Sequence, residues 1–380
     1  MAETEPGDGV DRRALLLSGL AVSGAIMATP LFPREQPAIT SKGSDGLRAR
    51  ADRKGLLCGT AVSYEILTGD KRIRDNLIED CNIIVPENEL KWSRIQPSRT
   101  GPFAYRNAQV IHDFASLHNI AVRGTCLHWW NAQPAWAKAY IPTLSAAQAG
   151  DFLQNYVRKV AGDWKGRLVH WDVTNEEIDG KGNLIDTLFA PILGEHYIDL
   201  CFNAVRDTDP DTLRCYNINY VEQDTRYEDG MRSSVLRQLE RLLHRGVPIQ
   251  CVGIQSHLTT MTGFTEMRYR AFLDEITAMG LKLLVTEFDV SDRGTIGSVA
   301  VRDAATAALG KAYLDIMFSY PGCLGLLSWG PTDKYHWLRR VPEKQRSDRL
   351  PLRAAPLDDE FRRKPLWHAI AAAIDAAAPR

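Results

Sequence analysis

Short apolar runs alternate with longer amphipathic segments from about residue 51 onward. The runs have the length and composition of buried strands, and we expect strands at residues 56–62, 82–87, 121–129, 168–176, 213–219, 251–258, 282–290 and 324–330. The segments between them carry apolar residues at helical spacing, most clearly at 108–118, 146–161, 197–208, 231–245, 265–279 and 301–319. This alternation favours parallel strands that are joined by helical crossovers.

The strand pattern predicts an α/β fold, a single (β/α)8 TIM barrel, over residues 51–380. An open, doubly wound sheet is the alternative. No Gly-x-Gly-x-x-Gly or Gly-x-x-x-x-Gly-Lys motif follows a predicted strand, which argues against a nucleotide-binding form of that sheet. In a barrel, chemistry belongs at the carboxyl ends of the strands.

The first 50 residues lack this pattern. Arg12 and Arg13 stand directly before a weakly apolar run that is rich in Gly and Ser and shorter than the roughly 20 residues of a spanning helix. We interpret residues 1–28 as a twin-arginine signal peptide and residues 29–50 as a linker. An uncleaved anchor, or a chance arginine pair, is the alternative. The protein is therefore expected in the periplasm or outside the cell, free of the membrane after processing.

Charge and cysteine content narrow the choice of partners. The formal net charge is -1, so the charge gives no reason to expect nucleic acid or an anionic membrane as a partner. The seven cysteines are odd in number, include no Cys-x-x-Cys pair and lie mostly in apolar runs. They are therefore interpreted as buried free thiols. We expect a monomer that needs no metal and no organic cofactor.

Two of the predicted strands end in a glutamate. Glu176 ends the sequence Trp-Asp-Val-Thr-Asn-Glu, and Glu287 follows Leu-Leu-Val-Thr. A lone glutamate at a strand end is usually an ordinary surface carboxylate. Two at the same end of a barrel could serve a retaining glycosidase, which uses one as acid/base and the other as nucleophile, with carboxyls about 5–5.5 Å apart.

The other predicted strand ends are rich in tryptophan, Asn, Gln, His and Lys. Flat indole faces suit the apolar faces of sugars, and the polar groups suit their hydroxyls. The tryptophans concerned are Trp92, Trp129, Trp130, Trp136, Trp329 and Trp337. This mixture predicts a polysaccharide as the partner.

The two glutamate motifs resemble the signatures of glycoside hydrolase family 10, the (β/α)8-barrel β-1,4-xylanases. The resemblance covers nearly all of residues 51–375 and includes 87–92, 123–136, 253–257, 329–333, 351–352 and 364–365. It implies a retaining endo-β-1,4-xylanase, which hydrolyses internal xylosidic bonds of xylan by double displacement.

The same resemblance implies a role for each matching residue. Glu176 would be the acid/base and Glu287 the nucleophile, with His257 bonded to Glu287 and oriented by Asp289. The substrate contacts that it implies are Asn175, Gln255, Glu87, Asn88, Lys91, Trp129, Trp130, Asn217, Trp329 and Trp337.

The chain departs from the family pattern in the third strand segment. Thr125 and Trp130 stand where the family has histidines, and Ala132 replaces a glutamine. Residues 217–219 also differ from the usual Asn-Asp-Tyr. Because these positions adjoin the cleavage point in the family, two other functions stay open. One is a retaining glycosidase acting on another β-glycan or an exopolysaccharide, and the other is a catalytically inactive glycan-binding barrel.

Replacing Arg12 and Arg13 together by lysine should retain the protein in the cytoplasm, because twin-arginine export depends on that pair. Cell fractionation followed by immunoblotting measures the effect. The matched control is Arg34→Lys, in the expected linker. A double variant exported as well as this control would contradict the signal assignment.

Overall fold

The computed structural model describes residues 45–380, so the predicted signal peptide and most of the predicted linker lie outside the described residues. Within residues 45–380, ten parallel strands form one sheet in the order β10-β1-β2-β3-β5-β6-β7-β9-β8, with β4 beside β5 and with β10 also pairing with β9. The sheet closes because β1 (Leu57–Val62) pairs with β10 (Cys323–Ser328). The remaining strands are β2 (Ile83–Pro86), β3 (Ala121–Gly124), β4 (His128–Trp129), β5 (His170–Asn175), β6 (Leu213–Ile218), β7 (Cys251–Ile254), β8 (His257–Thr259) and β9 (Lys282–Ser291).

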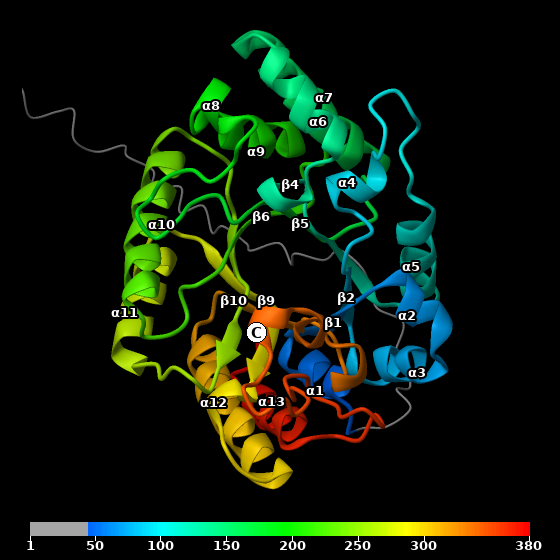
Figure 1. The fold of residues 1–380 in the computed structure, drawn as a ribbon, viewed down its shortest axis with the longest axis vertical. Helices are drawn as coiled ribbons and strands as arrows, with labels where there is room; N and C mark the ends of the chain where they lie inside the picture. The colour runs from blue at the N-terminus through cyan, green and yellow to red at the C-terminus, as the bar shows by residue number, and fades with distance from the viewer. Residues whose placement is uncertain (1–44) are drawn as a thin grey trace, which may run out of the picture. The chain divides into compact units, whose positions relative to one another are not determined.

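Helices surround this barrel (Figure 1). They are α1 (Leu47–Lys54), α2 (Tyr64–Gly69), α3 (Lys71–Asp80), α4 (Trp92–Ile95), α5 (Arg106–Leu117), α6 (Ala135–Tyr140), α7 (Ala146–Asp163), α8 (Ala190–Leu193), α9 (His196–Thr208), α10 (Arg226–His244), α11 (Glu266–Ala278), α12 (Val299–Ser319) and α13 (Pro365–Ala376). The (β/α)8 prediction is therefore confirmed. No helix within residues 45–380 is long and apolar enough to cross a membrane.

Two predicted strands are each divided in the structure. Residues 125–127 separate β3 from β4. In this break the Leu127 amide bonds to the Asp172 carbonyl (3.0 Å), and regular pairing with β5 resumes at His128 and Thr174. Residues 255 and 256 separate β7 from β8, where Ser256 has a left-handed backbone (φ 65°). Such a residue interrupts the extended strand geometry. Both breaks lie at the carboxyl end of the barrel, where they redirect side chains.

Helix α1 corrects the predicted boundary between linker and barrel. It begins at Leu47, so residues 47–50 belong to the folded domain and not to the linker. Leu47 and Ala51 are buried, and the Leu47 amide donates to the Asp80 side chain (2.9 Å). Arg50 forms an ion pair with Asp375 at the end of α13. Because these contacts are tertiary, the local sequence pattern gave no sign of them.

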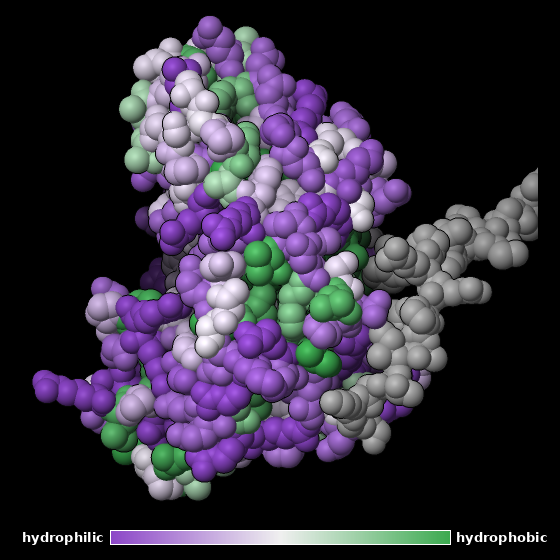
Figure 2. Space-filling model, turned by 90° about the vertical axis from the view of Figure 1, so that its right-hand side faces the viewer, coloured by the Kyte–Doolittle hydropathy of each residue, from purple (hydrophilic) through white to green (hydrophobic). Residues whose placement is uncertain are grey.

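The core has two layers. An inner cluster fills the barrel and includes Val85, Cys215, Leu284 and Leu327, whereas a larger cluster lies between the sheet and the helices. All seven cysteines are free and buried, as predicted. Polar side chains dominate the face shown in Figure 2, and hydrophobic residues gather near its middle.

Candidate active site

A cleft of about 650 Å³ opens at the carboxyl ends of the strands. The side chains predicted for catalysis and substrate binding line it, with three exceptions: Asn217, and the tryptophans Trp92 and Trp136, which pack in the core between the sheet and the helices. They come from β2, β4, β5, β7, β8, β9 and β10 and from the loops that follow these strands. The barrel therefore brings together residues that are up to 250 positions apart (337 minus 87).

Glu176 follows β5 directly and has a left-handed backbone conformation (φ 59°). Its Oε1 accepts a hydrogen bond from Gln255 Nε2 (2.7 Å), and its Oε2 accepts one from Trp129 Nε1 (3.0 Å). Burial raises the pKa of Glu176, and the nearby charge of Glu287 adds to this, although the Gln255 bond opposes it. This carboxyl therefore keeps its proton to a higher pH than an ordinary glutamate does.

Glu287 lies within β9 and has a different set of neighbours. Its Oε1 accepts from Asn217 Nδ2 (2.9 Å), and its Oε2 lies 3.4 Å from His257 Nε2. Asn217 thus donates a hydrogen bond to one carboxyl oxygen, and His257 lies at ion-pair distance from the other. The two glutamates thus have different surroundings: Glu287 faces an amide and an imidazole, whereas Glu176 faces an amide and an indole.

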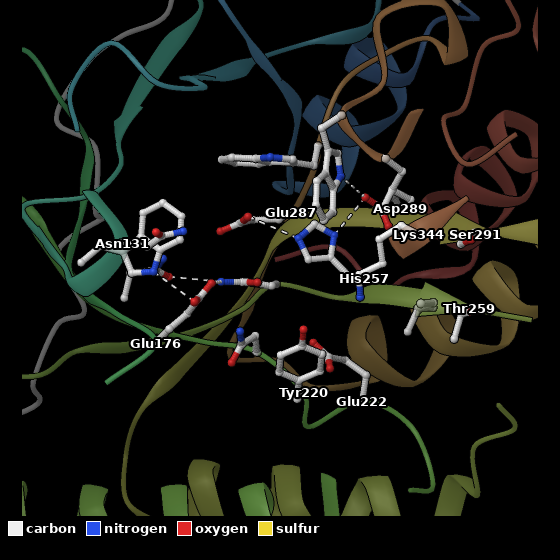
Figure 3. A pocket seen from close by; sticks show the side chains of 18 of the residues that line it. Asn131, Glu176, Tyr220, Glu222, His257, Thr259, Glu287, Asp289, Ser291 and Lys344 are labelled. Atoms are coloured by element: carbon white, nitrogen blue, oxygen red, sulfur yellow. Dashed lines mark hydrogen bonds and ion pairs between the residues drawn. The ribbon is translucent and has the colours of Figure 1, made fainter. Parts of the chain in front are cut away.

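His257 carries the charge that faces Glu287. Its Nδ1 lies 2.9 Å from Asp289 Oδ2, which also accepts from Trp337 Nε1 (2.8 Å). Burial alone would lower the pKa of His257, but the charge of Asp289 and the bonds to both carboxylates outweigh it and raise the pKa to about 10. Burial alone would raise the pKa of Asp289, but the charge of His257 and its hydrogen bond outweigh burial, so the pKa of Asp289 is lowered. Figure 3 shows His257 between the two carboxylates.

Asn217 does not lie where the sequence interpretation placed it. It is fully buried and lies behind the cleft wall. Its Nδ2 donates to Glu287 Oε1 and to Asn175 Oδ1 (2.8 Å), and its Oδ1 accepts from Thr286 (2.8 Å). Asn217 therefore bonds to two residues that face the cleft and does not itself line it. Strand alternation turns its side chain into the barrel, which the motif comparison could not show.

Aromatic side chains and one lysine form the other wall. The Lys91 ammonium lies 5.0 Å from the ring centre of Trp129 and 5.8 Å from that of Trp329, and it donates to Asn88 Oδ1 (3.0 Å). Trp130 packs edge-on against Trp129 and keeps part of its ring exposed to the cleft. This wall offers flat apolar faces beside hydrogen-bond donors and acceptors, the combination that binds sugars.

Several lining residues were missed by the sequence interpretation. They lie beyond the strand ends, on loops or, for Tyr227, at the start of α10, and include Ile178, Asp179, Ile185, Tyr227, Met261, Arg293 and Lys344. Tyr220 and Tyr227 pack edge-to-face (5.6 Å) and are 46% and 49% exposed. Loop residues of this kind reach the cleft only through tertiary packing, so spacing alone gave no signal. No group of three His, Cys, Asp or Glu side chains within residues 45–380 is arranged to hold a metal ion.

Comparison with known proteins places this geometry in a family. A β-1,4-xylanase of Dictyoglomus thermophilum is 32% identical over 280 residues, which cover 70% of this chain and 76% of that protein. Endo-1,4-beta-xylanase 2 of Aureobasidium pullulans is 27% identical over 95% of this chain and 98% of its own length. The crystal structure of xylanase 10B from Thermotoga petrophila RKU-1 in complex with xylobiose superposes with a TM-score of 0.77 at 25% identity, over 87% of this chain and 97% of that one.

The family model for glycosyl hydrolase family 10 matches residues 46–373. This match covers nearly all of the described barrel, including the two glutamates, the histidine between the carboxylates and the tryptophan wall. It begins one residue before helix α1, in agreement with the corrected start of the domain. The chain is a glycoside hydrolase and belongs to glycosyl hydrolase family 10.

Proposed function

We propose that the protein is an exported, retaining endo-β-1,4-xylanase. The observation that carries this proposal is the pair Glu176 and Glu287, whose contrasting surroundings suit one as acid and the other as nucleophile, inside a cleft lined by tryptophans. The names of the relatives support xylan as the substrate, and one similar structure contains xylobiose.

In the first step, the Glu287 carboxylate attacks the anomeric carbon of the sugar. The bond from this carbon to the leaving oxygen breaks, and that oxygen takes the proton of Glu176. The leaving chain departs, and the remaining sugar is held as an ester on Glu287. His257 and Asn217 each contact one oxygen of the Glu287 carboxyl and hold the group in place for the attack.

In the second step, Glu176 acts as a base. Ester formation removes the negative charge of Glu287, which is one of the causes that raise the pKa of Glu176. The pKa of Glu176 therefore falls once the intermediate forms, and its carboxylate can take a proton from water. The water oxygen attacks the anomeric carbon from the side that the leaving group vacated, while the ester bond to Glu287 breaks and Glu287 leaves as a carboxylate. The product therefore keeps the β configuration, and Glu176 has regained its proton.

The remaining polar groups hold the sugars. Asn88 and Lys91 would bond to hydroxyls on the non-reducing side, with Trp329 and Trp337 as walls, while Glu87 lies nearby and faces Arg340 (3.5 Å). Asn175 has its carbonyl oxygen occupied by Asn217 and Gln255, so its amide hydrogens are left to bond to a sugar hydroxyl.

An acidic β-glycan, such as an exopolysaccharide, is the second candidate substrate. Arg293 and Lys344 line the cleft, and neither forms an ion pair with a carboxylate of the described residues. Neighbouring Arg302 and Arg346, in contrast, are both paired with Asp292. Two unpaired cations on a cleft wall would attract uronate groups. Measuring the release of reducing ends from plain xylan, uronate-substituted xylan and acidic exopolysaccharides distinguishes the two candidates.

Export is part of the proposal. Xylan is a polymer too large to enter a cell, so export would bring the enzyme to its polymeric substrate. Arg12 and Arg13 support the twin-arginine route. We further propose that the enzyme acts as a monomer, since the residues of a single chain are sufficient to form the cleft.

Replacing Glu287 by Gln should abolish turnover of every substrate, leaving less than about a hundredth of the wild-type rate, because no other group forms the covalent intermediate. Replacing Glu176 by Ala should preserve the first step for aryl glycosides with very good leaving groups, which need no proton. Rates on xylan and on such aryl glycosides measure both effects. A Glu287→Gln protein that keeps more than this residual rate would refute the nucleophile assignment.

Replacing Gln255 by Met should move the alkaline limb of kcat/KM to higher pH. The hydrogen bond from Gln255 stabilises the charged form of Glu176, so its loss raises the pKa of Glu176 and the proton is kept to higher pH. Thr259→Val, a change in the same cleft away from Glu176, serves as the control. An alkaline limb that stays in place, or that moves to lower pH, would contradict the acid/base assignment.

A further inference from the structure

A buried charged cluster lies behind the acid/base glutamate, and the mechanism above does not use it. It consists of His128, Glu177 and Asp186, which are 0%, 1% and 4% exposed. We call these three residues the clasp. Burying charges is costly even when they are paired, so the clasp calls for an explanation beyond packing.

The three side chains form a bridged set of ion pairs. His128 Nδ1 lies 3.0 Å from Glu177 Oε1, and His128 Nε2 lies 3.2 Å from Asp186 Oδ2. Burial would lower the pKa of His128, but the two carboxylates outweigh burial and raise the pKa to about 10, so the ring is an imidazolium. Burial also disfavours the charge of Asp186, yet bonds to His128 and to backbone amides prevail and lower its pKa to about 2.

Neighbouring groups satisfy the remaining lone pairs. The Tyr197 hydroxyl donates to Glu177 Oε2, and Gln133 Nε2 donates to Asp186 Oδ2. The backbone amides that donate to Asp186 Oδ1 are those of Leu188 (2.8 Å), Phe189 (2.5 Å) and Ala190 (3.1 Å). These bonds connect β4, the loop after β5, α8 and α9, while His128 Nε2 faces Asp186 at ion-pair distance without a hydrogen bond of good geometry.

The clasp adjoins the acid/base in sequence and in space. His128 precedes Trp129 on β4, and Glu177 follows Glu176. The His128–Glu177 bond therefore runs beside the bond from Trp129 to Glu176 and joins the same two segments. Glu177 Oε1 also accepts a hydrogen bond from the backbone N–H of Asn175 (3.2 Å), the residue on the other side of Glu176. These bonds fix the backbone around Glu176, which has a left-handed conformation. Residues other than glycine adopt this conformation only when their surroundings hold them in it.

Glu177 and Asp186 also flank a loop that lines the cleft. Between them, Ile178 and Leu184 form an antiparallel bridge, and the Ile185 amide bonds to the Glu177 carbonyl (3.1 Å). Ile178, Asp179 and Ile185 face the cleft. His128 thus holds both ends of the loop that follows the acid/base.

We propose that His128, Glu177 and Asp186 are positioning residues that hold the Glu176 carboxyl where it can give its proton to the leaving group. The inference rests on the proposed retaining mechanism. Proton transfer requires the carboxyl to lie within hydrogen-bond reach of the leaving oxygen. A clasp that sets the backbone and the Trp129 bond provides that placement without touching the substrate.

The test compares aryl β-xylobiosides with good and with poor leaving groups. Glu177→Gln keeps the side-chain shape but weakens the bond to His128, and His128→Gln removes the imidazolium. In both variants, kcat/KM should fall at least about tenfold more for the poor leaving group than for the good one, since only the former needs the proton. Either variant alone is sufficient if the other does not fold.

Asp209→Asn is the matched control. Asp209 is a buried carboxylate that accepts from Thr212 Oγ1 (2.5 Å), and it lies before the amino end of β6, at the opposite end of the barrel. Its amide variant should lower the melting temperature and affect both leaving groups equally. Clasp variants that behave like this control, with equal losses for both leaving groups, would overturn the proposal.

A double variant shows whether the clasp acts through Glu176. When Glu177→Gln is added to Glu176→Ala, the ratio of the rates for the two leaving groups should change by less than about twofold, because the group to be positioned is already absent. A further change as large as that in the wild-type background would contradict the proposal. Failure of the wild-type protein to cleave any of these xylobiosides would refute the proposed function instead, so the two failures are distinguishable.

Discussion

The repulsion between two carboxylates in one cleft is the constraint on which this active site depends. Glu176 and Glu287 cannot both be ionised at low cost when they lie close together. The structure resolves this by giving Glu287 a charged donor, His257, and a buried amide, Asn217, while Glu176 is largely removed from water. Burial and the charge of Glu287 both raise the pKa of Glu176.

The register of the paired strands places the neighbours of the two glutamates. On the paired strands β8 and β9, His257 stands opposite Asp289, so the imidazole reaches Asp289 on one side and Glu287 on the other. On β4 and β5, Trp129 stands opposite Asn175, next to Glu176. The breaks between β3 and β4 and between β7 and β8 make these short pairings possible. The irregular ends of the barrel therefore determine the placement of the reacting groups, while its regular part provides rigidity.

The sequence predicted the barrel and most of the cleft, because both leave local signals. Apolar runs gave the strands, and strand-end residues such as Glu176, Glu287 and His257 converge in any parallel barrel. Other features depend on tertiary contacts that leave no periodic trace. The burial of Asn217, the start of α1 at Leu47 and the loop around Asp179 belong to this group. The clasp is a further example, since its three residues stand at unrelated spacings along the chain.

Trapping the covalent intermediate tests the central claim most directly. A xylobioside with fluorine at carbon 2 and a good leaving group slows the second step more than the first, so the glycosyl ester accumulates and can be located by peptide mass spectrometry. The account predicts one label per protein molecule, attached to Glu287. A label on Glu176 or on another residue, or turnover of the compound without any label, would contradict it.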